Sequence, residues 1–249
     1  MTRISVVTAV YNNRETIAAA LDSALGQAGA ELELIVIDGG STDGTLDILK
    51  SYANRLDVLV SEPDRGIYDA LNKGIRLASG DVIGFLHSDD LFADAKALSR
   101  VAAAFADARV GAVYGDLLYV RKDDPDSVVR YWRAGEFSRR RLGWGWMPPH
   151  PTLYVRRSVY ARTGGFDTSY RIAADYDYIL RLLGREDVGV RYIPDVLVKM
   201  RTGGASNRTL QNILRKSAED WRALRRNQVG GVGALMWKNL SKLPQFFGR

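Results

Sequence analysis

The sequence contains no cysteine and only two histidines, which excludes several kinds of site at once. Disulfides, thiolate metal sites and a cysteine nucleophile cannot form, and the lack of cysteine suits a reducing compartment. Two histidines are too few for a histidine-rich transition-metal centre. Long apolar runs are also missing, because the apolar segment at residues 4–10 is too short for a signal sequence or a membrane span. We therefore expect no secretion signal and no transmembrane helix.

The composition is that of a folded domain with an unevenly distributed charge. Of the 249 residues, 46% are hydrophobic and 26% are charged, which is usual for a soluble globular chain of one large domain or a domain with an appendage. The net charge is +6, and ten Lys and Arg residues follow position 200, against only Glu219 and Asp220. This basic tail predicts an anionic partner, either a membrane surface or a polyanion.

Short β-branched runs alternate with helical patterns through the first half of the chain. Such alternation is typical of βαβ units, and a first run without alternation of apolar and polar residues indicates a strand covered on both faces. The predicted fold class is α/β, with a Rossmann-like, mostly parallel central sheet flanked by helices. An N-cap pattern at Asn12 and Glu15 predicts the start of the first helix. The strands are expected at residues 4–9, 32–37, 58–60 and 82–86, and the helices at 17–25, 46–56, 70–78 and 175–183.

Polar clusters follow four of the predicted strands, at residues 8–12, 38–43, 62–69 and 87–90. In open α/β sheets, ligands bind outside the carboxyl ends of the strands, so we expect these loops to converge on one site. Asp, Asn, Gly and Ser at strand ends also serve simply as turn formers. The adjacent carboxylates Asp89 and Asp90 indicate more than a turn, because hard oxygen ligands directly after a buried strand suit Mg²⁺ or Mn²⁺.

Two regions beyond the strands are distinctive. Residues 143–150 carry Trp146 and His150 in an aromatic, proline-rich stretch that cannot form a regular helix; its aromatic rings could stack on sugars or simply pack. The tail has two amphipathic pieces. We expect the first, residues 210–226, to pack on the body through Leu210, Ile213, Leu214, Trp221 and Leu224. The second, residues 234–249, is predicted to contact a membrane surface.

Several motifs together resemble the family 2 inverting glycosyltransferases with the GT-A fold. The resemblance covers roughly residues 3–205 and includes a segment similar to enzymes that build bacterial surface polysaccharides, such as the colanic acid and O-antigen transferases. It implies a catalytic domain at residues 1–205, with a nucleotide-sugar half (1–115) and an acceptor half (116–205), followed by a helical tail (206–249). The motifs are TAVYN at 8–12, IDGGSTDGT at 37–45, EPDRGIYDALNKG at 62–74, FLHSDD at 85–90, GGFD at 164–167 and ADYD at 174–177.

The resemblance also implies roles for individual residues. Thr8 and Asp38 contact the base with Tyr11 stacking nearby, Asp89 binds the metal that bridges the diphosphate, and Asp175 deprotonates the acceptor hydroxyl. Further nucleotide contacts are expected from Ala9, Gly66, Asn72 and Ser88. Contacts to donor or acceptor are expected from His87, Asp90, Trp146, His150, Arg201 and Ser206, the last two within a loop that closes over the diphosphate.

The chain departs from the family pattern at three positions. His87 replaces the first Asp of Asp-x-Asp, Gly39 replaces the second Asp of Asp-Asp-Gly-Ser, and Ala174 replaces the Glu beside the base. The metal-binding position survives. Asp175 becomes the sole base candidate of its pair, and we expect Asp177 on the same helix to be structural.

We therefore predict a metal-dependent hexosyl- or N-acetylhexosaminyl-transferase that uses Mn²⁺ or Mg²⁺. It would move a sugar from a nucleotide-sugar donor, most simply a UDP-sugar, to a polyprenyl-diphosphate-linked glycan, peripherally at the inner face of the bacterial cytoplasmic membrane and without nucleic acid. Two alternatives stay open. A sugar-phosphate nucleotidyltransferase is disfavoured because residues 8–13 lack glycine. A non-catalytic sugar- or polyanion-binding module would need neither Asp89 nor Asp175.

Overall fold

The computed structural model describes residues 2–203, 210–231 and 233–236. Its first half is a run of βαβ units in which four strands pair in parallel, in the order β3-β2-β1-β4. The strands are β1 (Arg3–Val10), β2 (Glu31–Asp38), β3 (Val58–Ser61) and β4 (Val82–Phe85), and the helices between them are α1 (Ile17–Leu25), α2 (Thr45–Ser51), the 3₁₀ turn η1 (Ala53–Arg55) and α3 (Ile67–Leu77).

The second half extends the same sheet with mixed directions. Strand β8 is antiparallel to both β4 and β6, β9 is parallel to β6, and β5 and β7 run antiparallel at the periphery, which gives a nine-stranded sheet in the described chain. The elements are β5 (Leu91–Phe92), α4 (Ala97–Ala104), β6 (Val110–Val120), β7 (Val128–Trp132), α5 (Arg139–Leu142), η2 (His150–Thr152), β8 (Tyr154–Arg156), α6 (Arg157–Thr163), α7 (Ala174–Leu183), β9 (Gly189–Arg201) and α8 (Leu210–Arg226).

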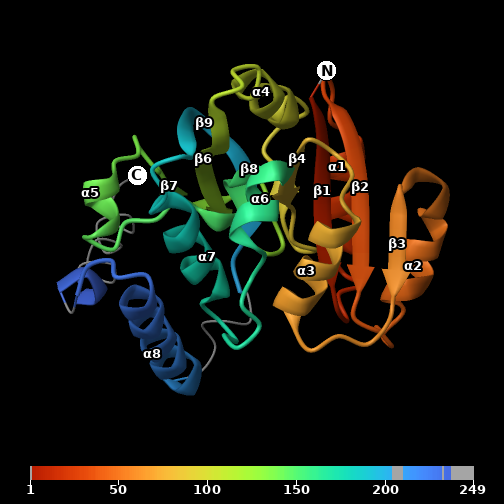
Figure 1. Cartoon of the computed structure of the whole chain (residues 1–249). Helices are drawn as coiled ribbons and strands as arrows, with labels where there is room; N and C mark the ends of the chain where they lie inside the picture. Colours follow the sequence, from red (N-terminus) through yellow and green to blue (C-terminus); the bar gives the residue numbers. More distant parts are fainter. Residues whose placement is uncertain (1, 204–209, 232, 237–249) are drawn as a thin grey trace.

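The sheet separates two hydrophobic cores, and β1 contributes to both. Val7 and Ala9 face one core with residues of α3, α6 and α7, whereas Val6 and Val10 face the other with residues of α1, α2 and α4. Side chains along a strand alternate between faces, so a mostly apolar strand is the expected sequence for the centre of a three-layer structure. Figure 1 shows α3, α6 and α7 in front of the sheet.

The predicted fold class is confirmed, and the four predicted strands lie within one or two residues of their observed bounds. Helix α1 has its predicted bounds of 17–25, but its N-cap is Thr16 and not Asn12, because the Asn12 side chain accepts the Thr42 backbone N–H at 2.8 Å instead of capping a helix. Helix α2 ends at Ser51, and a 3₁₀ turn replaces the continuous helix expected to residue 56.

Helix α8 packs against the body beside α7, as expected for the first tail piece (Figure 1). Ala223 and Leu224 are buried in the core that α7 shares. Leu214 was expected on the packed face, but 71% of it is exposed, and the side chains of Leu210 and Ile213 lie outside the described residues. Residues 237–249, most of the second tail piece, lie outside the described residues. Within the part that the structure describes, no helix has the length and apolarity needed to cross a bilayer.

Candidate functional site

The loops that follow β1, β2 and β4 meet at one edge of the sheet and are cross-linked there. The strands end in register, since Val10 pairs with Asp38 and Val7 with Phe85. The Asn12 backbone N–H donates to Ser41 Oγ at 2.8 Å. Asn13 Nδ2 donates to Ser88 Oγ at 2.9 Å. This convergence is the one predicted for ligand binding at the carboxyl ends of parallel strands.

Asp38 lies at the end of β2 and is completely buried. Its carboxylate accepts hydrogen bonds from the Ser41 backbone at 3.1 Å, from Ser41 Oγ at 2.5 Å and from Ser61 Oγ at 2.6 Å. Through these hydrogen bonds Asp38 holds in place both the loop that follows β2 and the end of β3. Thr8 is also buried, and its hydroxyl has no hydrogen-bond partner within the described chain. Tyr11 is 62% exposed and can stack on a ligand.

Gly39 provides room at this edge that a side chain would fill. A Cβ added there would lie 2.5 Å from Asp64 Oδ2 and 3.4 Å from the Tyr11 ring. Asp64 itself accepts the Gly66 backbone N–H at 2.7 Å, where Gly66 has a φ of 113°. The carboxylate of Asp64 therefore lies beside position 39, where the family pattern has an Asp. The sequence reasoning missed Asp64, although it lies within a recognised motif.

The acidic turn after β4 is held in place by Arg201, the last residue of β9. The Arg201 guanidinium donates to the Asp89 carbonyl at 2.8 Å, which leaves the Asp89 carboxylate for a ligand. The Arg201 backbone N–H donates to Asp90 Oδ1 at 3.2 Å. Burial and the charge of Asp89 raise the pKa of Asp90 well above its usual range, against the effect of Arg201. Arg201 therefore positions the turn as the last residue of β9, not from the predicted loop, and its contact with a diphosphate stays a prediction.

The oxygen atoms of this turn suit a cation whose remaining ligands come from a bound substrate. Among the described residues, no three His, Asp or Glu side chains are arranged to hold a metal ion. Hard divalent cations are often held by one or two carboxylates together with substrate phosphates. Asp89 and Asp90 supply carboxylates of that kind, and Asp90 Oδ2 is a buried oxygen with no hydrogen-bond partner in the described chain. The turn fits Mg²⁺ or Mn²⁺ bridged to a diphosphate, and it does not fit a site made of protein ligands alone.

The two histidines are brought together beside the turn. Their ring centroids are 5.8 Å apart, and His150 stacks on Phe85 at 5.5 Å. Burial lowers the pKa of both, that of His150 to about 4, while the negative charge of Asp175 opposes the shift in each. His150 Nε2 is buried without a hydrogen-bond partner in the described chain. Both imidazoles are therefore neutral near pH 7.

Asp175 stands in the first turn of α7, where the sequence placed it. Its Oδ1 accepts a hydrogen bond of 3.3 Å from the Tyr68 hydroxyl, which also donates to the Ile172 carbonyl at 2.6 Å. Burial and the nearby Asp175 raise the pKa of Tyr68 well above 10, so this hydroxyl remains a donor. Tyr68 was not recognised from the sequence, because the contact joins residues far apart in the chain.

Asp177 has the structural role expected of it. It is completely buried, pairs with Arg181 at 2.9 Å, and accepts Asn227 Nδ2 at 3.0 Å. The two carboxylates of α7 thus differ in their surroundings. Asp177 is buried in an ion pair with Arg181, whereas Asp175 is half-buried near the two histidines.

Other predicted residues are engaged in packing. The Asn72 amide donates to the Phe166 carbonyl and accepts the Phe166 N–H, both at 2.8 Å, so it joins α3 to the loop before α7. Trp146 donates to the Ala134 carbonyl at 3.0 Å and packs edge-on to Tyr114. Ligand contacts by Asn72 and Trp146 stay predictions, and Ser206 lies outside the described residues.

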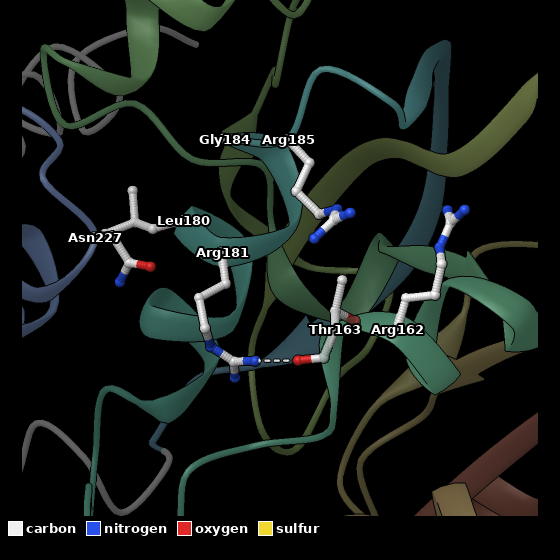
Figure 2. A pocket seen from close by; sticks show the side chains of 7 residues that line it. All are labelled: Arg162, Thr163, Leu180, Arg181, Gly184, Arg185 and Asn227. Carbon is white, nitrogen blue, oxygen red and sulfur yellow. Dashed lines mark hydrogen bonds between the residues drawn. The ribbon is translucent and has the colours of Figure 1, made fainter.

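A hollow of about 310 Å³ is lined by residues of α6 and α7 and of the segments that directly follow α7 and α8 (Figure 2). Arg181 donates to the Thr163 carbonyl at 2.6 Å, and Arg162 and Arg185 both pair with Asp187. The cations around the hollow are therefore already compensated. None of the predicted site residues lines it, so the candidate site is the sheet edge.

Comparison with known proteins agrees with this geometry. The model of the family "Glycosyl transferase family 2" matches residues 5–165. A "PGL/p-HBAD biosynthesis glycosyltransferase" of Mycobacterium bovis (strain BCG / Pasteur 1173P2) is 33% identical over 208 residues, which cover 82% of this chain and 78% of that protein. Two solved structures share the fold. TarS of S. aureus has a TM-score of 0.67 at 18% identity, over 98% of this chain and 43% of TarS. A Pyrobaculum calidifontis mannosyltransferase, in complex with GDP-Man and Mn²⁺, has a TM-score of 0.65 at 22% identity, over 99% and 73%.

Proposed function

Since the chain belongs to glycosyl transferase family 2 and is a glycosyltransferase, we propose that it is an inverting, metal-dependent enzyme that transfers a hexose or N-acetylhexosamine. The donor in this proposal is a UDP-sugar, and the acceptor is a glycan carried on a polyprenyl diphosphate. Residues 1–115 bind the donor and residues 116–205 provide the acceptor side. One observation carries the proposal: Asp89 and Asp175 both lie near enough to His87 for their charges to raise its pKa against the effect of burial, so the donor turn and the base candidate are close to the same histidine.

The donor half of the proposal rests on the sheet edge. Thr8 and Asp38 lie at the ends of β1 and β2, and Tyr11 is exposed beside them. A structure of residues 1–349 of TarS is in complex with UDP-GlcNAc, which supports a UDP-sugar as the first donor to test. A divalent cation at Asp89 would neutralise the charge on the departing diphosphate. His87 and Asp90 border this position and limit its access to water.

The chemical step requires a base on the acceptor side. Tyr68 occupies Oδ1 of Asp175, which leaves Oδ2 for the acceptor hydroxyl. Asp175 accepts the proton of that hydroxyl while its oxygen attacks the anomeric carbon from the face opposite the diphosphate. The new glycosidic bond forms as the bond to the diphosphate breaks, so one displacement inverts the configuration. The neutral imidazoles of His87 and His150 do not compete for this proton near pH 7.

A pair of variants tests the proposal. Asp175→Asn should lower transfer by about 100-fold or more and retain donor affinity, because its amide cannot accept the proton. Asp89→Ala should abolish the part of donor binding that depends on Mn²⁺. Donor binding is measured by thermal shift and calorimetry with UDP, UDP-glucose, UDP-N-acetylglucosamine and GDP-mannose, with Mn²⁺ or EDTA. Transfer is measured as nucleotide release with a synthetic polyprenyl-diphosphate-linked N-acetylglucosamine.

Asp187→Asn is the matched control, since Asp187 is exposed and lies beyond the far end of α7. Transfer by Asp175→Asn at the wild-type rate would remove the base assignment. Donor binding that is unaffected by EDTA, together with no turnover of any tested pair, would favour a non-catalytic sugar-binding module.

A further inference from the structure

One face of α8 holds the segment that leads into the base candidate. This anchoring face consists of Glu219, Arg222 and Arg226, which are three and four residues apart and so lie on one side of a helix. Arg222 donates to Ser169 Oγ at 2.7 Å and its guanidinium lies 4.4 Å from the Tyr170 ring centroid. Arg226 pairs with Asp167. The anchoring face therefore contacts the chain from residue 167 up to the start of α7.

Glu219 makes the most concentrated of these contacts. Its carboxylate accepts three successive backbone N–H groups, from Arg171 at 3.1 Å, Ile172 at 2.8 Å and Ala173 at 3.0 Å. The N-cap of α7 is Ala173, which has no side-chain oxygen to cap the helix. A carboxylate at a helix N-terminus satisfies free N–H groups and interacts favourably with the helix dipole. Helix α8 thus holds the three residues that lead into α7, up to its N-cap Ala173.

We propose that Glu219 is a positioning residue for Asp175, an inference that rests on the proposed role of Asp175 as the base. The link runs through three contacts. Glu219 holds the Ile172 N–H, the Ile172 carbonyl accepts the Tyr68 hydroxyl proton at 2.6 Å, and the same hydroxyl oxygen lies 3.3 Å from Asp175 Oδ1. Because the three N–H groups directly precede the first turn of α7, Glu219 sets where that turn begins and where the Asp175 carboxylate points.

The donor site should not depend on this contact. Its residues come from the ends of β1, β2 and β4, and their cross-links involve Asn12, Asn13 and Ser61. Loss of the Glu219 carboxylate would leave the N–H groups to water and let the start of α7 move. A misplacement of the base affects the chemical step more than binding, since proximity acts on the transition state. A kcat effect without a KM effect for the donor is therefore the distinguishing result.

The experiment compares Glu219→Ala, Glu219→Gln and the control Glu186→Gln, which changes an exposed glutamate just beyond α7. We expect kcat to fall by about 100-fold in Glu219→Ala and by about tenfold in Glu219→Gln, which keeps one acceptor oxygen. The donor KM should stay within about twofold of wild type. Hydrogen exchange should accelerate at the Ile172 and Ala173 amides. An unchanged kcat in Glu219→Ala would overturn the proposal, as would equal changes in kcat and donor KM.

A double variant separates failure of this inference from failure of the proposed function. If Glu219 acts through Asp175, Glu219→Ala should cause little further loss in an Asp175→Asn background, because the two effects are not independent. Full additivity would contradict a positioning role even if both single variants lose activity. If Asp175→Asn is fully active, the base assignment itself is wrong. Should Glu219→Ala fail to fold, the kcat and exchange rates of Glu219→Gln decide the question.

Discussion

At the scale of single residues, the absence of a side chain at position 39 shapes the donor site. Gly39→Asp would restore the carboxylate of the family pattern, but it would force Cβ to 2.5 Å from Asp64 Oδ2. We expect the donor KM to rise by about tenfold or more, because two like charges would share one site, with a smaller change in kcat. Steady-state kinetics at varied donor concentration measure both.

A companion variant tests whether Asp64 is the cause. Gly39→Asp combined with Asp64→Ala keeps a single carboxylate at this place, and we expect it to recover most of the donor affinity. Gly39→Ala controls for bulk alone. A donor KM equally poor in the double variant would show that the backbone at Gly39, not charge, sets the requirement for glycine.

The residues predicted from the sequence and those missed differ in a physical way. Asp38, Asp89 and Asp175 follow local patterns, a strand end or a helix start, and the structure places each there. Tyr68 and Glu219 act through partners more than 40 residues away, and no local pattern reports such a pairing. Asn72 lies in a recognised motif, yet its amide bonds the backbone of Phe166.

At the scale of elements, α8 is held partly by a titratable contact. Burial alone would raise the pKa of Asp167, but hydrogen bonds from Ser169 and Arg226 outweigh it and lower the pKa to about 2. The pKa of an aspartate in an unfolded chain is about 3.9. Asp167 therefore stabilises the fold fully above pH of about 4, and this contribution is lost as the pH falls toward about 2.

We expect Asp167→Asn to lower the urea midpoint at pH 6 and to differ progressively less from wild type as the pH falls below about 4. Asp47→Asn, at an exposed position of α2, is the control and should show a much smaller difference at pH 6. A constant gap between Asp167→Asn and wild type from pH 6 to pH 3 would contradict the ionic origin of the contact.

The elements themselves were predicted unevenly for similar reasons. The interiors of strands β1, β2 and β4 are mostly apolar and buried on both faces, so burial and sequence agree. The N-cap of α1 was misplaced because the Asn12 side chain bonds the Thr42 backbone of another loop. The antiparallel strand β8 between β4 and β6 was not foreseen, since its three residues carry little pattern of their own.

At the scale of the whole molecule, charge and catalysis occupy different regions. The net charge of +6 arises after residue 200, and α8 carries part of it on the body of the protein. Val229, Ala234 and Leu235 pack against the core that includes α7, so a truncation at residue 227 would damage the fold. A chain that ends at Met236 retains every residue that the structure describes, and it is the better test of the membrane proposal.

The proposed membrane contact then depends on residues 237–249, which contain Trp237, Phe246 and Phe247 with three basic residues and no acidic one. Basic and aromatic residues together favour an anionic interface. The full chain should sediment with phosphatidylglycerol vesicles, less at 0.5 M salt, where the Debye length falls to about 4 Å, and not with phosphatidylcholine vesicles. The chain ending at Met236 should lose most of this binding while keeping its donor affinity, because the sheet edge is intact. Equal sedimentation of both chains would place the membrane contact on the folded body, with the arginines of α8 as the first residues to test.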